Sequence, residues 1–173
     1  DFSIFPTYLV SKLAREKVTV SLSGDGGDEL FGGYETYVAQ QMAERYSKVP
    51  APLRAMVNAA ADVLPPSAKK KGLVNKVKRF TEGYRFPAGL GHARWRIFLN
   101  DALRHSLFTP EFAGSFERPA GHHITQLFAQ AGDLEGVNRD LYVDAKSYMV
   151  DNCLVKVDRM SMAVSLEVRV PLL

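Results

Sequence analysis

The sequence predicts an α/β fold in which helices make up most of the 173 residues. A short β-branched run at residues 18–22 (VTVSL) is too short for a helix and is bounded by turn signals, so we expect a buried strand there. The turn that follows, residues 23–29 (SGDGGDE), is rich in glycine and carboxylates. Nearly all of the chain beyond this turn carries helical periodicity, and a helix, a strand and a loop site in that order form one unit of an α/β sheet.

The first predicted helix covers residues 2–16, with Pro6 in its first turn. Its apolar face is expected to carry Phe5, Tyr8, Leu9 and Leu13. Because a lone strand cannot form a sheet, we expect the partners of strand 18–22 to lie upstream of residue 1. The helices predicted after the turn cover residues 31–46, 52–64, 85–99, 124–131 and 141–166.

The composition excludes several classes of protein. Hydrophobic residues make up 46% of the chain, which indicates a globular protein, and a net charge of +3 is too small to argue for nucleic acid. The single cysteine, Cys153, excludes an internal disulfide and fits a reducing compartment, so we expect a cytoplasmic protein. No membrane-spanning apolar run or signal peptide is visible. The chain starts without Met, and we expect both ends to have been cut from a longer chain.

Basic residues cluster between positions 67 and 80, and two interpretations compete. One is a surface for RNA or phosphate, and the other is a solvated helix face that we favour because no aromatic stacking pattern accompanies the charge. The basic residues are Lys69, Lys70, Lys71, Lys76, Lys78 and Arg79.

The glycine-rich turn at residues 23–29 has the residue types of a binding site for a phosphate together with a divalent cation. A strand that runs into such a turn aims backbone N–H groups at one point, which suits an anion such as a nucleotide phosphate. Asp25, Asp28 and Glu29 would repel a bare phosphate, but they suit a divalent cation bound together with one, since Mg²⁺ favours one or two carboxylates plus phosphate oxygens. The alternative is an Asp-rich turn in which Asp28 or Glu29 only caps the next helix.

The 141–166 stretch is the second informative region. Its apolar positions recur every three or four residues, while Asn152, Lys156 and Arg159 cluster on another face. One interpretation is purely structural: these charged residues form salt bridges within the protein, with Asp158 among the partners. The functional one is that Lys156 and Arg159 neutralise developing phosphate charge, and the residues alone leave both open.

Two strings of the sequence carry a family resemblance. Residues 23–34 (SGDGGDELFGGY) resemble the signature of the synthetase domain of glutamine-hydrolysing asparagine synthetases. Residues 154–173 (LVKVDRMSMAVSLEVRVPLL) resemble the second signature of the same family, about 120 residues later and in the family's order. The helical middle is similar to the family in character only.

The resemblance implies a domain of the adenine-nucleotide alpha-hydrolase-like type, a Rossmann-like ATP-pyrophosphatase fold, that lacks its upstream strands here. Residues 1–48 would be the last part of the nucleotide-binding α/β unit, and residues 49–173 would be the helical part. The family's pyrophosphate loop (SGGxDS) is absent from these residues and belongs upstream, as does an N-terminal glutaminase domain. We therefore expect this chain alone to have no synthetase activity.

The resemblance also implies substrates and roles. Family members use ATP and Mg²⁺ to adenylate the aspartate side chain, and ammonia from glutamine then gives asparagine, AMP and pyrophosphate. No nucleic-acid or membrane partner is implied, and a homodimer through an open strand edge is compatible with it. The residues carried over are Ser23, Gly24, Gly26 and Gly27 for the nucleotide, Asp28 for Mg²⁺, and Asp25, Lys156 and Arg159 for catalysis.

Two other functions stay open at this stage. A related synthetase could act on another carboxylate, as in β-lactam-forming synthetases or amidotransferases of peptide and polysaccharide pathways. Asp25 favours the asparagine branch, because the β-lactam branch tends to have Tyr there. The second alternative is a helical binding module that keeps the signatures without catalysis.

Overall fold

The computed structural model describes residues 2–65 and 72–173, which divide into two compact units. The first unit joins the residues up to Tyr34 with Val137–Leu173, and the second spans Glu35–Gly136. Both signature stretches of the sequence therefore lie in the first unit, although they are far apart in the chain. The boundary expected near residue 48 falls inside the second unit.

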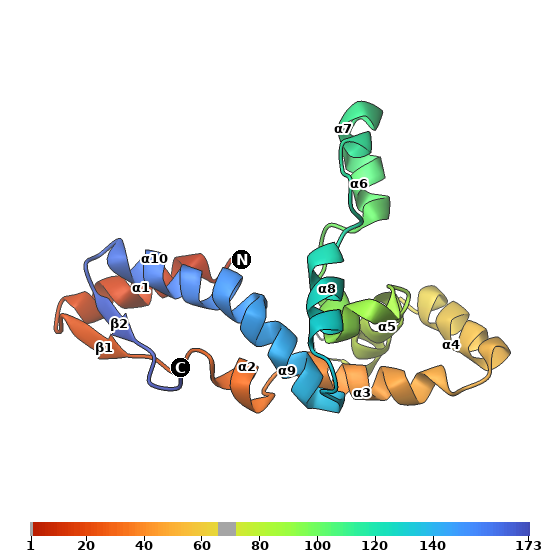
Figure 1. Cartoon of the computed structure of the whole chain (residues 1–173), viewed down its shortest axis with the longest axis horizontal. Helices are drawn as coiled ribbons and strands as arrows, with labels where there is room; N and C mark the ends of the chain where they lie inside the picture. Colours follow the sequence, from red (N-terminus) through yellow and green to blue (C-terminus); the bar gives the residue numbers. More distant parts are fainter. Residues whose placement is uncertain (1, 66–71) are drawn as a thin grey trace. The chain divides into compact units, whose positions relative to one another are not determined.

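The first unit is built around two paired strands and two packed helices. Strand β1 (Val20–Leu22) pairs in parallel with β2 (Glu167–Arg169), and helix α1 (Ile4–Arg15) packs against α10 (Val155–Met162) (Figure 1). In the strand register Val20 lies opposite Glu167, and Leu22 opposite Arg169. The other elements are α2 (Gly27–Phe31), α9 (Gly136–Lys146) and η2 (Met149–Leu154), a π-helical segment.

Strand β2 corrects the prediction that every partner of β1 lies upstream, since β2 comes from the end of the chain. Three residues of sequence Glu-Val-Arg carry too little periodicity to indicate a strand, and pairing with β1 creates it. Ser165 has a positive φ of 58°, which turns the chain out of α10. The ladder also reaches the glycine-rich turn, because the Ser23 amide donates to the Arg169 carbonyl at 2.9 Å.

The predicted 31–46 helix is wrong at its start. Helix α2 ends at Phe31, and Gly32 caps it in the left-handed conformation with φ of 73°, a geometry that favours glycine. Helix α3 (Glu35–Ser47) then begins anew. Gly33 lies in this break because a Cβ there would come within 2.0 Å of an Asp28 carboxylate oxygen. The two glycines therefore end one helix and make room for an acidic side chain.

The predicted 141–166 helix is likewise interrupted. It consists of α9, the π-helical segment η2 and α10, with the last ending at Met162. A π segment adds a residue to the turn and so rotates the following side chains relative to a regular helix. The uniform 3.6-residue period is therefore broken across residues 149–154, although Cys153 and Val157 of the predicted apolar face are buried.

The predicted apolar face of α1 is solvent-exposed in this chain. The side chains of Phe5, Leu9 and Leu13 are 65%, 63% and 64% exposed, and β1 and β2 each have one unpaired edge within the described residues. None of the described helices combines the length and apolar character required to cross a membrane.

The described residues of the second unit form helices and connecting loops, with no strand among them. The 3₁₀ segment η1 (Ala88–Trp95) packs against three helices of this unit, α3, α5 (Leu73–Tyr84) and α8 (His122–Gln130). This segment replaces the predicted 85–99 helix, because Gly91 has φ of 50° and a Cβ there would lie 2.2 Å from the Phe128 ring. Its elements after α3 are α4 (Ala51–Val63), α5 (Leu73–Tyr84), η1 (Ala88–Trp95), α6 (Asp101–Leu107), α7 (Pro110–Gly114) and α8 (His122–Gln130).

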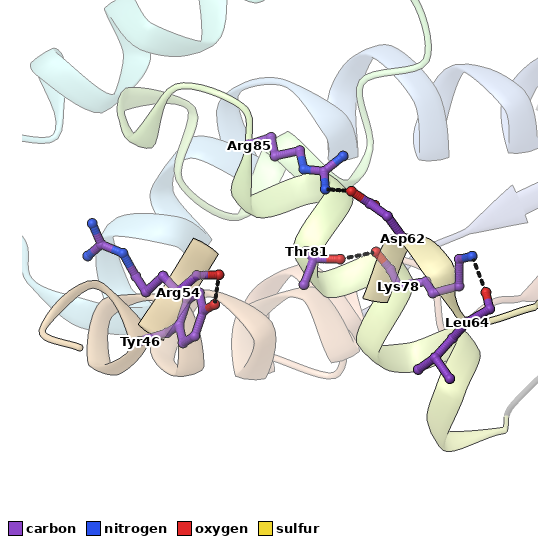
Figure 2. A network of polar contacts seen from close by, with 7 residues as sticks. All are labelled: Tyr46, Arg54, Asp62, Leu64, Lys78, Thr81 and Arg85. Atoms are coloured by element: carbon purple, nitrogen blue, oxygen red, sulfur yellow. Dashed lines mark hydrogen bonds and ion pairs between the residues drawn. The ribbon is translucent and has the colours of Figure 1, made fainter. Parts of the chain in front are cut away.

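Polar contacts join α4 to α5 (Figure 2). The Lys78 ammonium donates to the Leu64 carbonyl at 2.7 Å, and the Arg85 guanidinium pairs with Asp62 at 2.6 Å. Of the basic stretch, Lys78 and Lys76 thus bind groups of their own unit, Lys76 pairing with Glu35 at 3.6 Å, which agrees with the solvated-face interpretation. Lys69, Lys70 and Lys71 lie outside the described residues.

Candidate functional site

A cavity of about 310 Å³ opens at the carboxyl end of β1, within the first unit. Its walls come from the turn after β1, from α2, and from the η2 and α10 region near the other end of the chain. The lining residues are Ser23, Gly24, Asp25, Gly26, Asp28, Glu29, Tyr34, Tyr148, Cys153 and Lys156. The carboxyl end of a parallel strand is where open α/β sheets bind ligands.

The turn presents its backbone to the cavity. A Cβ at Gly24 would meet no atom within 4 Å, so a ligand can approach the main chain closely there. Gly26 has φ of 87°, a left-handed conformation that starts α2. The Ser23 hydroxyl donates to the Asp25 carboxylate, which holds that side chain over the turn. Gly27 does not line the cavity, and its amide instead donates to the Gly24 carbonyl at 3.2 Å and closes the turn.

Glu29 forms the buried base of the cavity and is only 2% exposed. Its carboxylate accepts hydrogen bonds from the Tyr34 hydroxyl and, at 3.1 Å, from the Cys153 thiol. Burial first, and then the bond to Glu29, raise the pKa of Tyr34 above its ordinary value. The same two causes raise the pKa of Cys153 from its ordinary 9.0 to about 11. Both groups therefore stay protonated near neutral pH and act as donors to Glu29.

The sequence did not indicate Tyr34, Tyr148 or Cys153 as site residues, and it suggested Glu29 only as a metal-site carboxylate or a helix cap. Cys153 belongs to the predicted apolar face, and it is indeed buried; it lies in the π-helical segment η2, and its thiol donates to Glu29. Tyr148 stands just before η2 and packs its ring against the edge of Tyr34, with centroids 5.8 Å apart. A π segment is often found at functional sites, but no local sequence pattern marks this one.

Lys156 is the cation that lines the cavity, and it comes from the first turn of α10. Its ammonium donates to the Ser3 hydroxyl of the α1 start at 2.8 Å. Arg159 and Asp158 are exposed and do not line the cavity. The structure thus brings Lys156 to the predicted turn residues but leaves Arg159 and Gly27 outside the lining.

The acidic residues of the turn can be tested for fit to a metal ion. Within residues 2–65 and 72–173, no three His, Cys, Asp or Glu side chains are grouped so that they alone could hold one. Asp25 and Asp28 nevertheless share the cavity with the open backbone at Gly24. Mg²⁺ is usually held by one or two carboxylates, with substrate phosphates and waters completing its shell, so two carboxylates suffice for a phosphate-bridged ion.

Comparisons with known proteins agree with the two sequence signatures. The whole chain, residues 1–173, matches the family model for asparagine synthase, which confirms the resemblance. The chain is 32% identical over 177 residues to asparagine synthetase (glutamine-hydrolyzing) 1 of Bacillus subtilis (strain 168), covering 100% of this chain and 26% of that protein. It is also 32% identical over 176 residues to a protein of Mycobacterium tuberculosis (strain ATCC 25618 / H37Rv) provisionally named asparagine synthetase (glutamine-hydrolyzing), covering 100% of this chain and 25% of that protein.

The chain therefore spans about a quarter of the length of these curated relatives. No solved structure matches it.

Proposed function

This chain belongs to the asparagine synthase family, and from that premise we propose that its cavity is part of the site where ATP adenylates an aspartate side chain. Ammonia released from glutamine would then give asparagine, AMP and pyrophosphate. The observation that carries the proposal is that one cavity joins both signature stretches. Asp25 and Asp28 come from the first stretch and Lys156 from the second.

The turn supports nucleotide binding. Ser23, Gly24 and Gly26 line the cavity, and the open backbone at Gly24 leaves room for a phosphate to approach main-chain N–H groups. Gly27 would act indirectly, since its amide closes the turn that shapes this backbone. We propose these four residues as the nucleotide contacts or their immediate support.

Asp28 is the proposed holder of Mg²⁺, with Asp25 beside it. When bound, the ion would be held by these carboxylates and would offset negative charge on the phosphates. The Ser23 hydroxyl fixes the Asp25 carboxylate at the cavity, where it would face the acyl group during formation or use of the adenylate. Because Gly33 has no Cβ, it leaves room for the Asp28 carboxylate.

Lys156 would neutralise charge during the reaction. In the first step an oxygen of the aspartate side chain bonds to the α-phosphorus, and the bond from that phosphorus to pyrophosphate breaks. In the second step ammonia bonds to the acyl carbon, the bond from that carbon to the AMP oxygen breaks, and the nitrogen releases one proton to leave the amide. A fixed ammonium in the cavity stabilises negative charge that grows on the phosphate oxygens. Arg159, exposed on α10, could contact only a substrate group that extends beyond the lining.

Further proposals concern the complete protein. We propose a ligase in which the cavity belongs to an adenine-nucleotide alpha-hydrolase-like domain, with residues 1–48 in its nucleotide-binding part and 49–173 in its helical part. A glutaminase domain of the same protein would supply ammonia, and the protein would work in the cytoplasm. The 173-residue chain by itself is expected to release no pyrophosphate.

The test is Asp28→Asn in the complete natural protein, with aspartate-dependent pyrophosphate release measured across a series of Mg²⁺ concentrations. Loss of a carboxylate that holds the ion should lower the rate by roughly 100-fold or more. Asp133→Asn is the matched control, because Asp133 is exposed and lies outside the cavity lining. A rate for Asp28→Asn equal to that of the control would contradict the metal role, and release without aspartate would contradict the substrate.

A further inference from the structure

Ser3 stands at the start of α1, but its hydroxyl does not cap that helix. A serine at this position normally accepts a hydrogen bond from an amide of the first helical turn. Here the side chain makes no such bond, and the Ser3 carbonyl instead accepts from the Thr7 amide at 3.0 Å and the Thr7 hydroxyl at 2.7 Å. The Ser3 hydroxyl accepts from the Lys156 ammonium at 2.8 Å. The Ser3 hydroxyl thus bonds a residue of another helix, α10, rather than an amide of its own helix.

Lys156 needs such a partner if its charge is to be placed accurately. Its side chain has four rotatable bonds, and fixing them costs conformational entropy. The packing of α1 on α10 brings the Ser3 hydroxyl beside the ammonium of a lysine that lines the cavity with Asp25 and Asp28. A hydrogen bond to a charged group is directional and stronger than a neutral one, so it restricts where the ammonium can lie.

We propose that Ser3 is a positioning residue for the adenylation reaction, one that holds the Lys156 ammonium where charge develops on the phosphate. This inference rests on the proposed function. Ser3 itself does not line the cavity and would act only through Lys156. Because a misplaced charge stabilises the transition state poorly, loss of the hydroxyl should affect turnover more than substrate binding.

The first experiment compares Ser3→Ala, Ser3→Thr and Lys156→Met in the complete natural protein, with kcat and KM for ATP taken from pyrophosphate release. Ser3→Ala should lower kcat by roughly 10-fold and change KM by less than about threefold, while Ser3→Thr, which keeps a hydroxyl, should retain most activity. Ser115→Ala is the matched control, because its hydroxyl bonds only within the end of α7, to the Phe112 carbonyl at 2.7 Å.

The outcomes separate the inference from the function on which it rests. If Lys156→Met abolishes turnover while Ser3→Ala matches the control, the positioning role is overturned and the proposed function stands. If Lys156→Met leaves turnover unchanged, the charge role of Lys156 and the positioning role both fail. Aspartate-independent release by the unaltered protein would overturn the proposed function itself.

A second readout does not depend on activity. Acetylation of Lys156 by N-hydroxysuccinimidyl acetate, followed by mass spectrometry of the peptide, reports how accessible the amine is. Without its bond to the Ser3 hydroxyl, the Lys156 amine should be acetylated several-fold faster in Ser3→Ala than in the unaltered protein or in Ser3→Thr. If Lys156 were acetylated at equal rates in all three proteins, and their melting temperatures were equal, the positioning role of Ser3 would be overturned.

Discussion

The thiol of Cys153 should react unusually slowly, and Glu29 should be one of the reasons. The side chain is 6% exposed, and its thiol donates to the Glu29 carboxylate at 3.1 Å. Burial and this bond raise its pKa from 9.0 to about 11. The informative change is Glu29→Gln, which removes the negative charge and keeps a side chain of nearly the same size.

The size of the effect follows from the thiolate population. A rise of about two pKa units lowers the thiolate fraction at pH 8 by about 100-fold. A more basic thiolate is roughly 10-fold more nucleophilic over that range, so the net slowing is about 10-fold before burial adds to it. Because burial is the larger cause and stays in place, Glu29→Gln should restore less than half of this pKa shift, which corresponds to a rate gain of roughly two- to threefold.

The assay is the reaction of the folded chain with 4,4′-dithiodipyridine at pH 8, followed by absorbance, beside an unfolded sample in denaturant. Glu167→Gln is the matched control, since Glu167 pairs on the surface with Arg169. The reasoning would be refuted if Glu29→Gln reacted at the rate of the control while both had the same melting temperature. A folded thiol as reactive as the unfolded one would refute it as well.

Three further predictions concern stability. Gly33→Ala should lower the free energy of unfolding by about 1–3 kcal/mol in denaturant titrations, because the new Cβ would meet the Asp28 carboxylate. Asn100→Ala should cost about 1 kcal/mol through loss of the α6 cap, with Asn100→Asp keeping most of it; an unchanged melting temperature would speak against the cap. Since the Cys153 pKa is raised, its contribution to stability should be intact below pH 9 and lost as the pH rises to about 11, and Cys153→Ala should flatten that decline in urea titrations.

Much of the site was predictable because it is local in the chain. The β-branched run ends where the glycine-rich turn begins, and Ser23, Gly24, Asp25 and Asp28 lie within six residues of each other. Any fold that forms this turn must bring them near one another. The same locality explains why the 52–64 helix, observed as Ala51–Val63, was predicted well.

The tertiary structure decided what no local period could indicate. Strand β2 forms because its backbone pairs with β1, and the packing of the first unit brings the Cys153 thiol to the Glu29 carboxylate, 124 positions away in the chain. The bond from Lys156 to Ser3 joins residues 153 positions apart, and it forms only because α1 packs on α10. The sequence alone thus determined which residues surround the turn and which family signatures they form. Only the fold decided which distant side chains complete the cavity, because contacts between distant segments depend on packing and leave no periodic trace in either segment.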